Sequence, residues 1–121
     1  LLTSSFVFAQ NTYVPDDNFE QALIDLGYDT TLDDSVLTAN ISGVTTLDVS
    51  DKEISDLTGI EAFTALVTLD MSENELTSID VSKNTALVYL ELVFNDSTND
   101  SSTVLGISMV TFGISLVPLE I

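Results

Sequence analysis

The stretch Leu66-x-x-Leu69-x-Met71-x-x-Asn74-x-Leu76 decides the fold, because its spacing returns along the chain. It recurs as Leu87-x-x-Leu90-x-Leu92-x-x-Asn95. A weaker version precedes it as Val44-x-x-Leu47-x-Val49-x-x-Lys52-x-Ile54. The three versions start 22 and then 21 residues apart, at 44, 66 and 87. Such a fixed period indicates stacked structural units, since one unit cannot bury both of its sides alone.

The alternation inside this stretch indicates a short strand. Leu69 and Met71 alternate with Thr68, Asp70 and Ser72, and successive side chains of a strand point to opposite faces. The pattern and its period therefore predict an α/β solenoid of leucine-rich repeats with short parallel strands. The residues that we expect to hold these repeats together are Leu47, Val49, Leu66, Leu69, Met71, Asn74, Leu76, Leu87, Leu90, Leu92 and Asn95.

Asn74 and Asn95 stand where the chain must leave the strand. A buried Asn side chain both donates and accepts hydrogen bonds, so it can satisfy backbone groups that the turn leaves unpaired. We expect a ladder of such amides along the stack. Lys52 stands at the same position of the first repeat and departs from the pattern.

The opposite face of the predicted strands is polar. Asp48, Asp70 and Glu91 share one repeat position, so parallel strands roughly 4.8 Å apart would stack them in a column. Such a column could bind a basic patch on a partner or a hydrated divalent cation, but we favour a solvated acidic face. The candidate binding residues on the whole face are Thr46, Asp48, Ser50, Thr68, Asp70, Ser72, Tyr89, Glu91 and Val93.

A helical cap is predicted before the first repeat. Pro15 fixes the entry, and Asp16, Asp17 or Asn18 can accept hydrogen bonds from the first free amides. Gly27 ends the helix. Residues 30–43 are expected to form an irregular connector with a possible short helix, in which Leu32, Val36, Leu37 and Ile41 pack. The apolar helix face that would cover the first repeat consists of Phe19, Ala22, Leu23 and Leu26.

Two segments resemble a known family. The run LDVSDKEISDLTGIEAFTALVTLDMSENELTSIDVSKNTALVYL (47–90) is similar to the repeats of secreted bacterial surface proteins of the internalin-like type. YVPDDNFEQALIDLGYD (13–29) resembles the helical cap of these proteins. The resemblance covers about residues 13–95 and implies adhesion or recognition of a protein or cell-surface ligand.

Composition excludes several functions. With 2 Lys+Arg against 20 Asp+Glu, a net charge of −18 and no His, the chain is a poor ligand for nucleic acid or anionic membranes. No Cys is present, so thiolate metal sites are excluded. Paired acids at 16–17 and 33–34 fit caps and turns, and the chain carries no catalytic motif. We expect no enzyme activity, no cofactor and no metal, because the calcium-like oxygens from Asp96 to Ser102 lack the glycine and closing glutamate of such a loop.

The two ends of the chain differ from the repeats. Residues 1–10 read as the tail of a signal peptide, with a packed strand as the alternative, and predict a secreted or cell-surface protein. After Asn95 the third repeat is expected to lose its second half, because Ser97 replaces the leucine. For the uncharged segment 103–119 we favour a terminal hairpin or edge strands over a membrane anchor, with a truncated or frame-disrupted end also open.

These observations divide the chain into four parts. They are a signal-peptide remnant (1–10), a cap and connector (11–43), leucine-rich repeats (44–95), and a polar loop with an apolar C-terminal segment (96–121). The predicted function is a non-catalytic extracellular module for protein or cell-surface recognition. The alternative is a structural spacer or stalk of a longer surface protein, with no ligand of its own.

Overall fold

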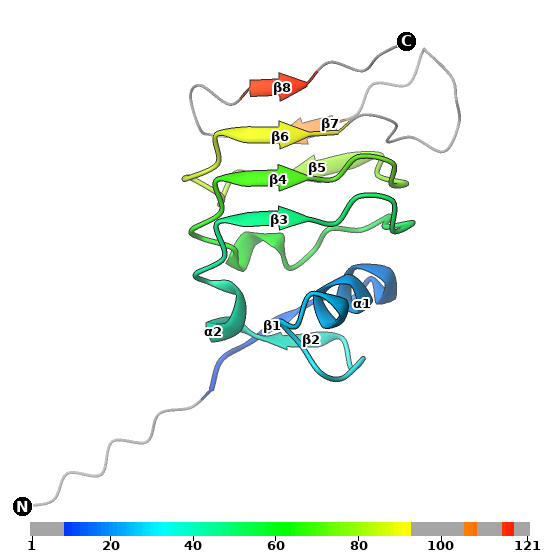
Figure 1. Cartoon of the computed structure of the whole chain (residues 1–121), viewed down its shortest axis with the longest axis vertical. Coiled ribbons are helices and arrows are strands. Elements are labelled where there is room, and N and C mark those ends of the chain that lie inside the picture. Colours follow the sequence, from blue (N-terminus) through cyan, green and yellow to red (C-terminus); the bar gives the residue numbers. More distant parts are fainter. Residues whose placement is uncertain (1–8, 93–105, 109–114, 118–121) are drawn as a thin grey trace, which may run out of the picture.

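The computed structural model describes residues 9–92, 106–108 and 115–117 (Figure 1). Most of the predicted signal peptide, the calcium-like loop, and the candidate residues Val93 and Asn95 lie outside these residues. The elements follow one another along the chain as β1 (Asn11–Tyr13), α1 (Asp17–Asp25), β2 (Ser35–Leu37), α2 (Thr38–Ile41), β3 (Thr46–Asp48), the 3-10 helix η1 (Ile60–Ala62), β4 (Thr68–Asp70), β5 (Ser78–Asp80), β6 (Tyr89–Glu91), β7 (Gly106–Ser108) and β8 (Ser115–Val117).

A parallel sheet of order β3-β4-β6-β8 runs up one side of the stack (Figure 1). Leu47 pairs with Leu69, Leu69 with Leu90, and Leu90 with Leu116, so neighbouring strands are in repeat register. Because side chains alternate between the faces of a strand, this register puts equivalent residues of successive repeats on the same face. The parallel strands predicted from the repeat spacing are therefore present.

The C-terminal strands take one of the two forms predicted for this segment. β7 pairs in parallel with β5, and β8 pairs in parallel with β6, so the two are edge strands of separate sheets and do not form the alternative hairpin. The third repeat also keeps a strand in its second half, contrary to the expectation drawn from Ser97. Strand pairing depends on backbone groups, so a longer repeat can keep the same register. The strands β3, β4, β6 and β8 start at residues 46, 68, 89 and 115, which are 22, 21 and then 26 residues apart.

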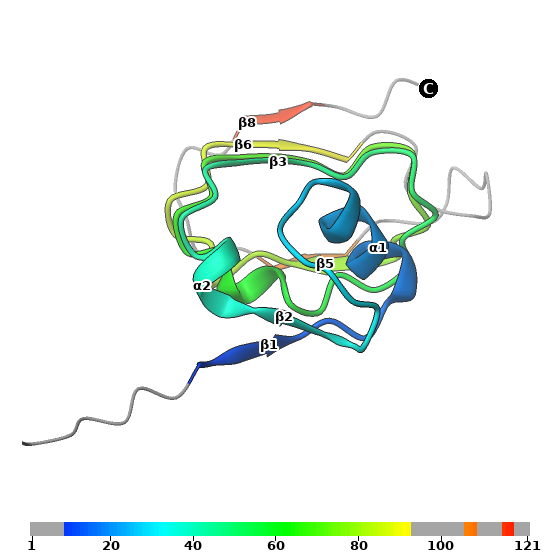
Figure 2. The same ribbon diagram turned by 60° about the horizontal axis from the view of Figure 1, so that its bottom comes forward.

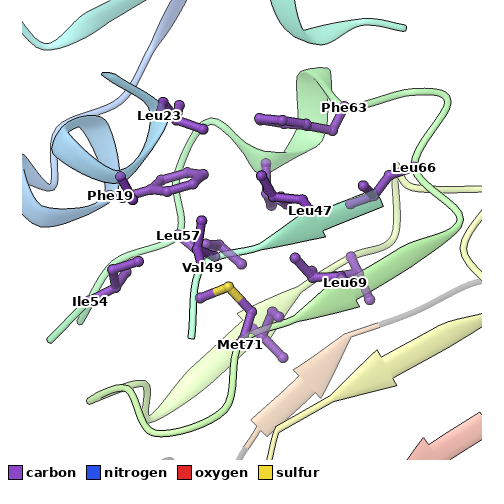
Figure 3. Close-up of a cluster of buried hydrophobic side chains, with 14 of the residues drawn as sticks. Phe19, Leu23, Leu47, Val49, Ile54, Leu57, Phe63, Leu66, Leu69 and Met71 are labelled. Carbon is purple, nitrogen blue, oxygen red and sulfur yellow. The ribbon is translucent and has the colours of Figure 1, made fainter. Parts of the chain in front are cut away.

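The helical cap is joined through aromatic packing to the first coil of the stack, which is the repeat that begins at Val44. The rings of Phe19 and Phe63 stack with centroids 6.4 Å apart. Figure 3 shows Phe19 and Leu23 of α1 facing the inward side chains of the first coil. Asp16 caps α1, and Gly27 follows its end at φ 86°, as the sequence predicted. Leu26 was expected on the buried face, yet its side chain is 47% exposed, at the residue that follows the last one of α1.

The connector is more regular than expected. The short helix α2 is present, but residues 35–37 form β2, which pairs antiparallel with β1. Val36 and Ile41 are buried, whereas Leu32 is 49% exposed and does not contribute to the core. The buried carboxylate of Glu20 shapes this turn by accepting three backbone amides, those of Asp33 at 2.9 Å, Asp34 at 3.0 Å and Ser35 at 3.2 Å.

The helices in the described part of the chain are short, with 9 residues in α1 and 4 in α2. None of its helices has the length and apolar character needed to cross a bilayer. Within the segment weighed as an anchor, residues 106–108 and 115–117 are strands.

Candidate binding face

The outer face of β3, β4 and β6 is the candidate site. Thr46 pairs with Thr68 and Thr68 with Tyr89, which makes one row of side chains across the strands. The next outward row is the acidic column predicted from the sequence, since Asp48 pairs with Asp70 and Asp70 with Glu91. Thr46 and Asp48 are exposed, while the other described members, Ser50, Thr68, Asp70, Ser72, Tyr89 and Glu91, are half-buried.

Two acids of the column have a structural task. The Oδ1 atom of Asp48 accepts the Ser50 amide at 3.0 Å and the Ser50 hydroxyl at 2.6 Å. Asp70 accepts the same two groups of Ser72 at the same two distances. Short turns of this kind let Asp and Ser bond locally where a strand ends. Part of the column is thus explained by the exit of the chain from β3 and β4.

Glu91 is bonded differently. Its Oε2 accepts the hydroxyl of Tyr89, 3.3 Å away, so the aromatic side chain and the acid are tied together on the third strand. Partial desolvation, followed by the charges of Glu91 and Asp70, raises the pKa of Tyr89 above its ordinary value of 10.0. The hydroxyl therefore stays protonated at neutral pH and remains a donor. The third strand consequently presents a face unlike those of the first two.

The field of the column is negative. The hydroxyl and the amide of Ser50 hold the pKa of Asp48 below its ordinary value of 3.8, with Lys52 adding to the effect. Asp48 is therefore ionised at neutral pH. A face that carries stacked carboxylates in a chain of net charge −18 attracts cationic groups and repels anionic ones.

Below the face, Asn74 performs the role predicted for it. Its Oδ1 accepts the backbone amides of Lys52 and Ile54, each at 3.0 Å. Its Nδ2 donates to the carbonyls of Val49 at 2.8 Å and Met71 at 3.0 Å, and also contacts that of Ser72 at 3.3 Å. This one buried side chain ties the turn of the second coil to that of the first.

Asn84 is a second such residue, and the repeat pattern did not reveal it. Its Nδ2 donates to the carbonyls of Ile60 at 2.8 Å and Phe63 at 3.1 Å, and the residue is fully buried. The available signal was the alignment of Phe63-Thr-Ala-Leu with Asn84-Thr-Ala-Leu, which places an amide where the preceding repeat has an aromatic ring. Phe63 packs against Phe19 of the cap helix, whereas Asn84 donates hydrogen bonds to backbone carbonyls.

One further group of acids lies on the cap. Asp17, Glu20 and Asp34 bring one carboxylate oxygen each to within 4.8 Å of one another. Both oxygens of Glu20 already accept backbone amides, and Asp34 belongs to the turn that donates them. The turn explains the positions of Glu20 and Asp34, and Asp17 lies in the first turn of α1, so this grouping does not by itself indicate a metal site.

Together, the parallel strands in repeat register and the buried asparagine of Asn74 define a leucine-rich-repeat protein. Over 75 residues the sequence is 35% identical to Internalin J of Listeria monocytogenes, a match that covers 62% of this chain and 8% of that protein. The chain is internalin-like by sequence and by structure. No protein-family model matches it.

Two solved structures of proteins from Listeria monocytogenes are similar in fold to this chain. The functional domain of InlJ has a TM-score of 0.57 at 25% identity, over 97% of this chain and 27% of that one. Internalin C2 has a TM-score of 0.63 at 23% identity, over 82% of this chain and 46% of that one. The InlJ domain is described as including a cysteine ladder, a feature that this chain, without Cys, does not share. The chain spans less than half of each of these relatives.

Proposed function

We propose that this chain is a non-catalytic extracellular recognition module that binds a protein or cell-surface ligand on the outer face of β3, β4 and β6. The observation that carries the proposal is the register. It stacks Thr46, Thr68 and Tyr89 in one row and the three acids in the next, so side chains distant in sequence form one continuous surface. Repeat proteins and other rigid scaffolds commonly bind their ligands on surfaces that several elements build together.

The rigidity of the face supports this function. Beyond the strand ends, the Val49 amide bonds the Asp70 carbonyl at 3.0 Å, and the Met71 amide bonds the Glu91 carbonyl at 2.9 Å. Asn74 fixes the turns behind them. A surface that is ordered before binding loses less conformational entropy when the ligand arrives.

The location and the role of the cap belong to the same proposal. An apolar segment ending at Ala9-Gln10 supports export, and the likeness to internalins supports a secreted or surface-attached protein. In this proposal residues 11–43 close the first coil, the repeats of residues 44–95 present the binding face, and β7 and β8 extend the stack.

The spacer or stalk remains the second candidate, and one observation favours it. The Oδ1 atoms of Asp48 and Asp70 bond Ser50 and Ser72, so turn formation alone accounts for these two acids. In a spacer the outer face would have no ligand, and the acids would serve only the strand exits and solubility.

Cell binding separates the two functions. The fluorescently labelled chain is incubated with cultured epithelial cells and with bacterial cells, and bound label is measured by flow cytometry over a concentration series. The face variant Tyr89→Ser/Asp70→Asn/Glu91→Gln should lower binding by about tenfold or more, since a central aromatic side chain often dominates an interface.

The matched control is Glu73→Gln/Glu75→Gln, which also removes two acids but from the exposed turn that follows β4, outside the candidate face residues. It should bind as the unmodified chain does. Saturable binding that survives the face variant, or falls equally in the control, would contradict recognition through this face. Absence of saturable binding to every cell type would favour the spacer.

A further inference from the structure

A groove lies on the cap between β1 and η1. It has a volume of about 470 Å³ and is lined by residues of β1, α2 and the η1 turn. Figure 2 shows β1 on the side of the molecule away from β3 and β6. Its lining includes no residue of the outer strand face, so the groove is a surface distinct from the candidate binding face.

Most residues that line the groove have polar side chains, but almost none of them is charged. Gln10 and Asn11 contribute amides, Ser42 and Thr64 contribute hydroxyls, and Glu61 is the one ionisable acid. Amides and hydroxyls can each donate and accept hydrogen bonds. The chain has 20 acidic residues, but this groove carries little of their charge. A neutral, hydroxyl-rich molecule could therefore form hydrogen bonds here, with no strong electrostatic attraction or repulsion.

Tyr13 supplies an aromatic surface at the groove. Its side chain is 61% exposed, more than any other large apolar or aromatic side chain in the described part of the chain. An exposed ring with a polar end has an apolar face for stacking and a hydroxyl for hydrogen bonding. Such a ring beside neutral amides matches a sugar ring, whose carbon-bound hydrogens form one apolar face and whose hydroxyls point outward.

The groove has two banks, one formed by β1 and α2 and the other by the η1 turn, and hydrogen bonds hold both in place. On one bank the hydroxyls of Thr12 and Thr38 lie 2.7 Å apart, and the Thr38 amide bonds the Gln10 carbonyl at 2.9 Å. On the other, the Gly59 amide bonds Oε2 of Glu61 at 2.8 Å. This fixed arrangement lowers the entropy cost of binding.

Gly59 joins the two banks by close approach. Its φ of 110° is a conformation that other residues rarely adopt, and a Cβ there would lie 2.9 Å from the Tyr13 carbonyl oxygen. Glycine thus lets the η1 turn sit directly against β1, beside Tyr13. Gly59 thereby approaches the backbone of Tyr13 and also bonds the Glu61 carboxylate.

We infer that this groove binds a neutral saccharide and that it is a site separate from the outer strand face. Tyr13 stacks on the sugar ring, the amides of Gln10 and Asn11 bond its hydroxyls, and Glu61 accepts a further hydroxyl. The volume falls within the roughly 300–1,000 Å³ of small-molecule sites. Phosphate is disfavoured because no Lys or Arg lines the groove, and a bare divalent cation because only one carboxylate does.

Nuclear magnetic resonance tests the site directly. The ¹⁵N-labelled chain is titrated with glucose, galactose, N-acetylglucosamine and N-acetylgalactosamine, each at millimolar concentration. At least one sugar should shift the amides of Asn11, Tyr13 and Thr64 in a saturable manner and leave those of Thr68 and Glu91 unchanged. Tyr13→Ala should weaken that affinity by about tenfold, whereas Tyr13→Phe should retain most of it.

The control is Leu32→Ala, which removes another exposed apolar side chain from the cap outside the groove and should leave the affinity unchanged. The spectra of each variant report whether the fold is intact. The inference is overturned if no sugar shifts the groove amides, if the shifts map to the strand face, or if a neutral Ser/Thr-rich peptide shifts them while no sugar does. Failure of this site leaves the strand-face proposal intact, because the face variant contains none of these residues.

Discussion

The carboxylate of Asp16 accepts the backbone amide of Ser55, 39 residues further along the chain, at a distance of 2.9 Å. The same oxygen accepts the Asp56 amide at 2.9 Å. The other oxygen caps α1 by accepting the amides of Asn18 at 2.9 Å and Phe19 at 3.1 Å. A single side chain therefore begins the cap helix and fastens it to the first coil.

Asp16→Asn should lower the free energy of unfolding by about 1–2 kcal/mol, because one acceptor becomes a donor facing amide donors. Urea denaturation followed by circular dichroism measures the loss. Asp17→Asn is the control: Asp17 is exposed in the same turn, so the change should cost only the helix-dipole contribution, about 0.3–1 kcal/mol. Equal losses in the two variants would contradict the role of Asp16 in joining cap and coil.

Acid should weaken this junction. Burial alone would raise the pKa of Asp16, but the amides of Ser55, Asp56, Phe19 and Asn18 outweigh it and hold that pKa below 3.8. A folded-state pKa below the unfolded one gives stability that is present above the unfolded value, about 3.9, and is lost as the pH falls through the folded value.

The measurement compares wild type with Asp16→Asn between pH 7 and pH 2.5. Their difference in unfolding free energy should be constant down to about pH 5 and then shrink as the wild-type carboxylate is protonated. Taking the difference also removes the opposite effect of relieved repulsion in a chain of charge −18. A difference that grows toward acid would overturn the sign.

Asn74→Ala should destabilise the stack by about 3 kcal/mol or more, since it leaves several buried backbone groups without their side-chain partner. The matched control is Asn40→Ala. Asn40 is exposed, and its amide donates to the Tyr28 carbonyl at 3.1 Å, so its loss should cost about 1 kcal/mol or less. Chemical denaturation of both variants tests the ranking, and a loss at Asn74 no larger than at Asn40 would contradict it.

The sequence predicted what depends on period and alternation. Leu69 and Met71 are buried, and Asn74 bonds the turn backbone, because a repeat fixes both the face and the turn position of each residue. Asn84 was missed because its role depends on the coil below, where Phe63 occupies the equivalent position and presents its carbonyl. That contact is tertiary, and although Phe63 and Asn84 align in successive repeats, the alignment alone does not show that the Asn84 amide reaches a backbone carbonyl.

The cap and the C-terminal segment were predicted less completely. Pro15 to Gly27 carries local helix signals, so α1 was predicted, but the extent of its apolar face was not, and Leu26 is exposed. The pairing of β1 with β2 depends on two segments separated by a helix. The outer strand face was predicted by residue, whereas the groove beside Tyr13 was not, because it forms only where β1, α2 and η1 meet.

Glu73 has a left-handed backbone with φ 57°, which costs energy for most residues, although Asn tolerates it better. Glu73→Asn should therefore stabilise the chain by about 0.5–1 kcal/mol, visible as a higher midpoint in urea. Glu75→Asn removes an acid two residues away, where no positive φ is present, and should give no such gain. Equal gains would mean that the charge and not the backbone sets the effect.

Asp70 is subject to two opposing effects. Its neighbours Asp48 and Glu91 lie on strands roughly 4.8 Å away, and each repulsion is worth about 1 kcal/mol in water at low salt. Its charge also strengthens the bonds from Ser72, by about 1 kcal/mol.

Asp70→Asn keeps an acceptor oxygen for Ser72 but removes the charge, so it should stabilise the chain at about 10 mM salt, where screening extends over about 30 Å. At about 1 M salt, screening falls to about 3 Å and repulsion is lost, so the variant should become less stable than wild type. Thermal unfolding across this salt series should show the two stabilities crossing. Parallel curves would mean that the acidic column does not repel itself, and that the turn bonds alone determine the stability contributed by Asp70.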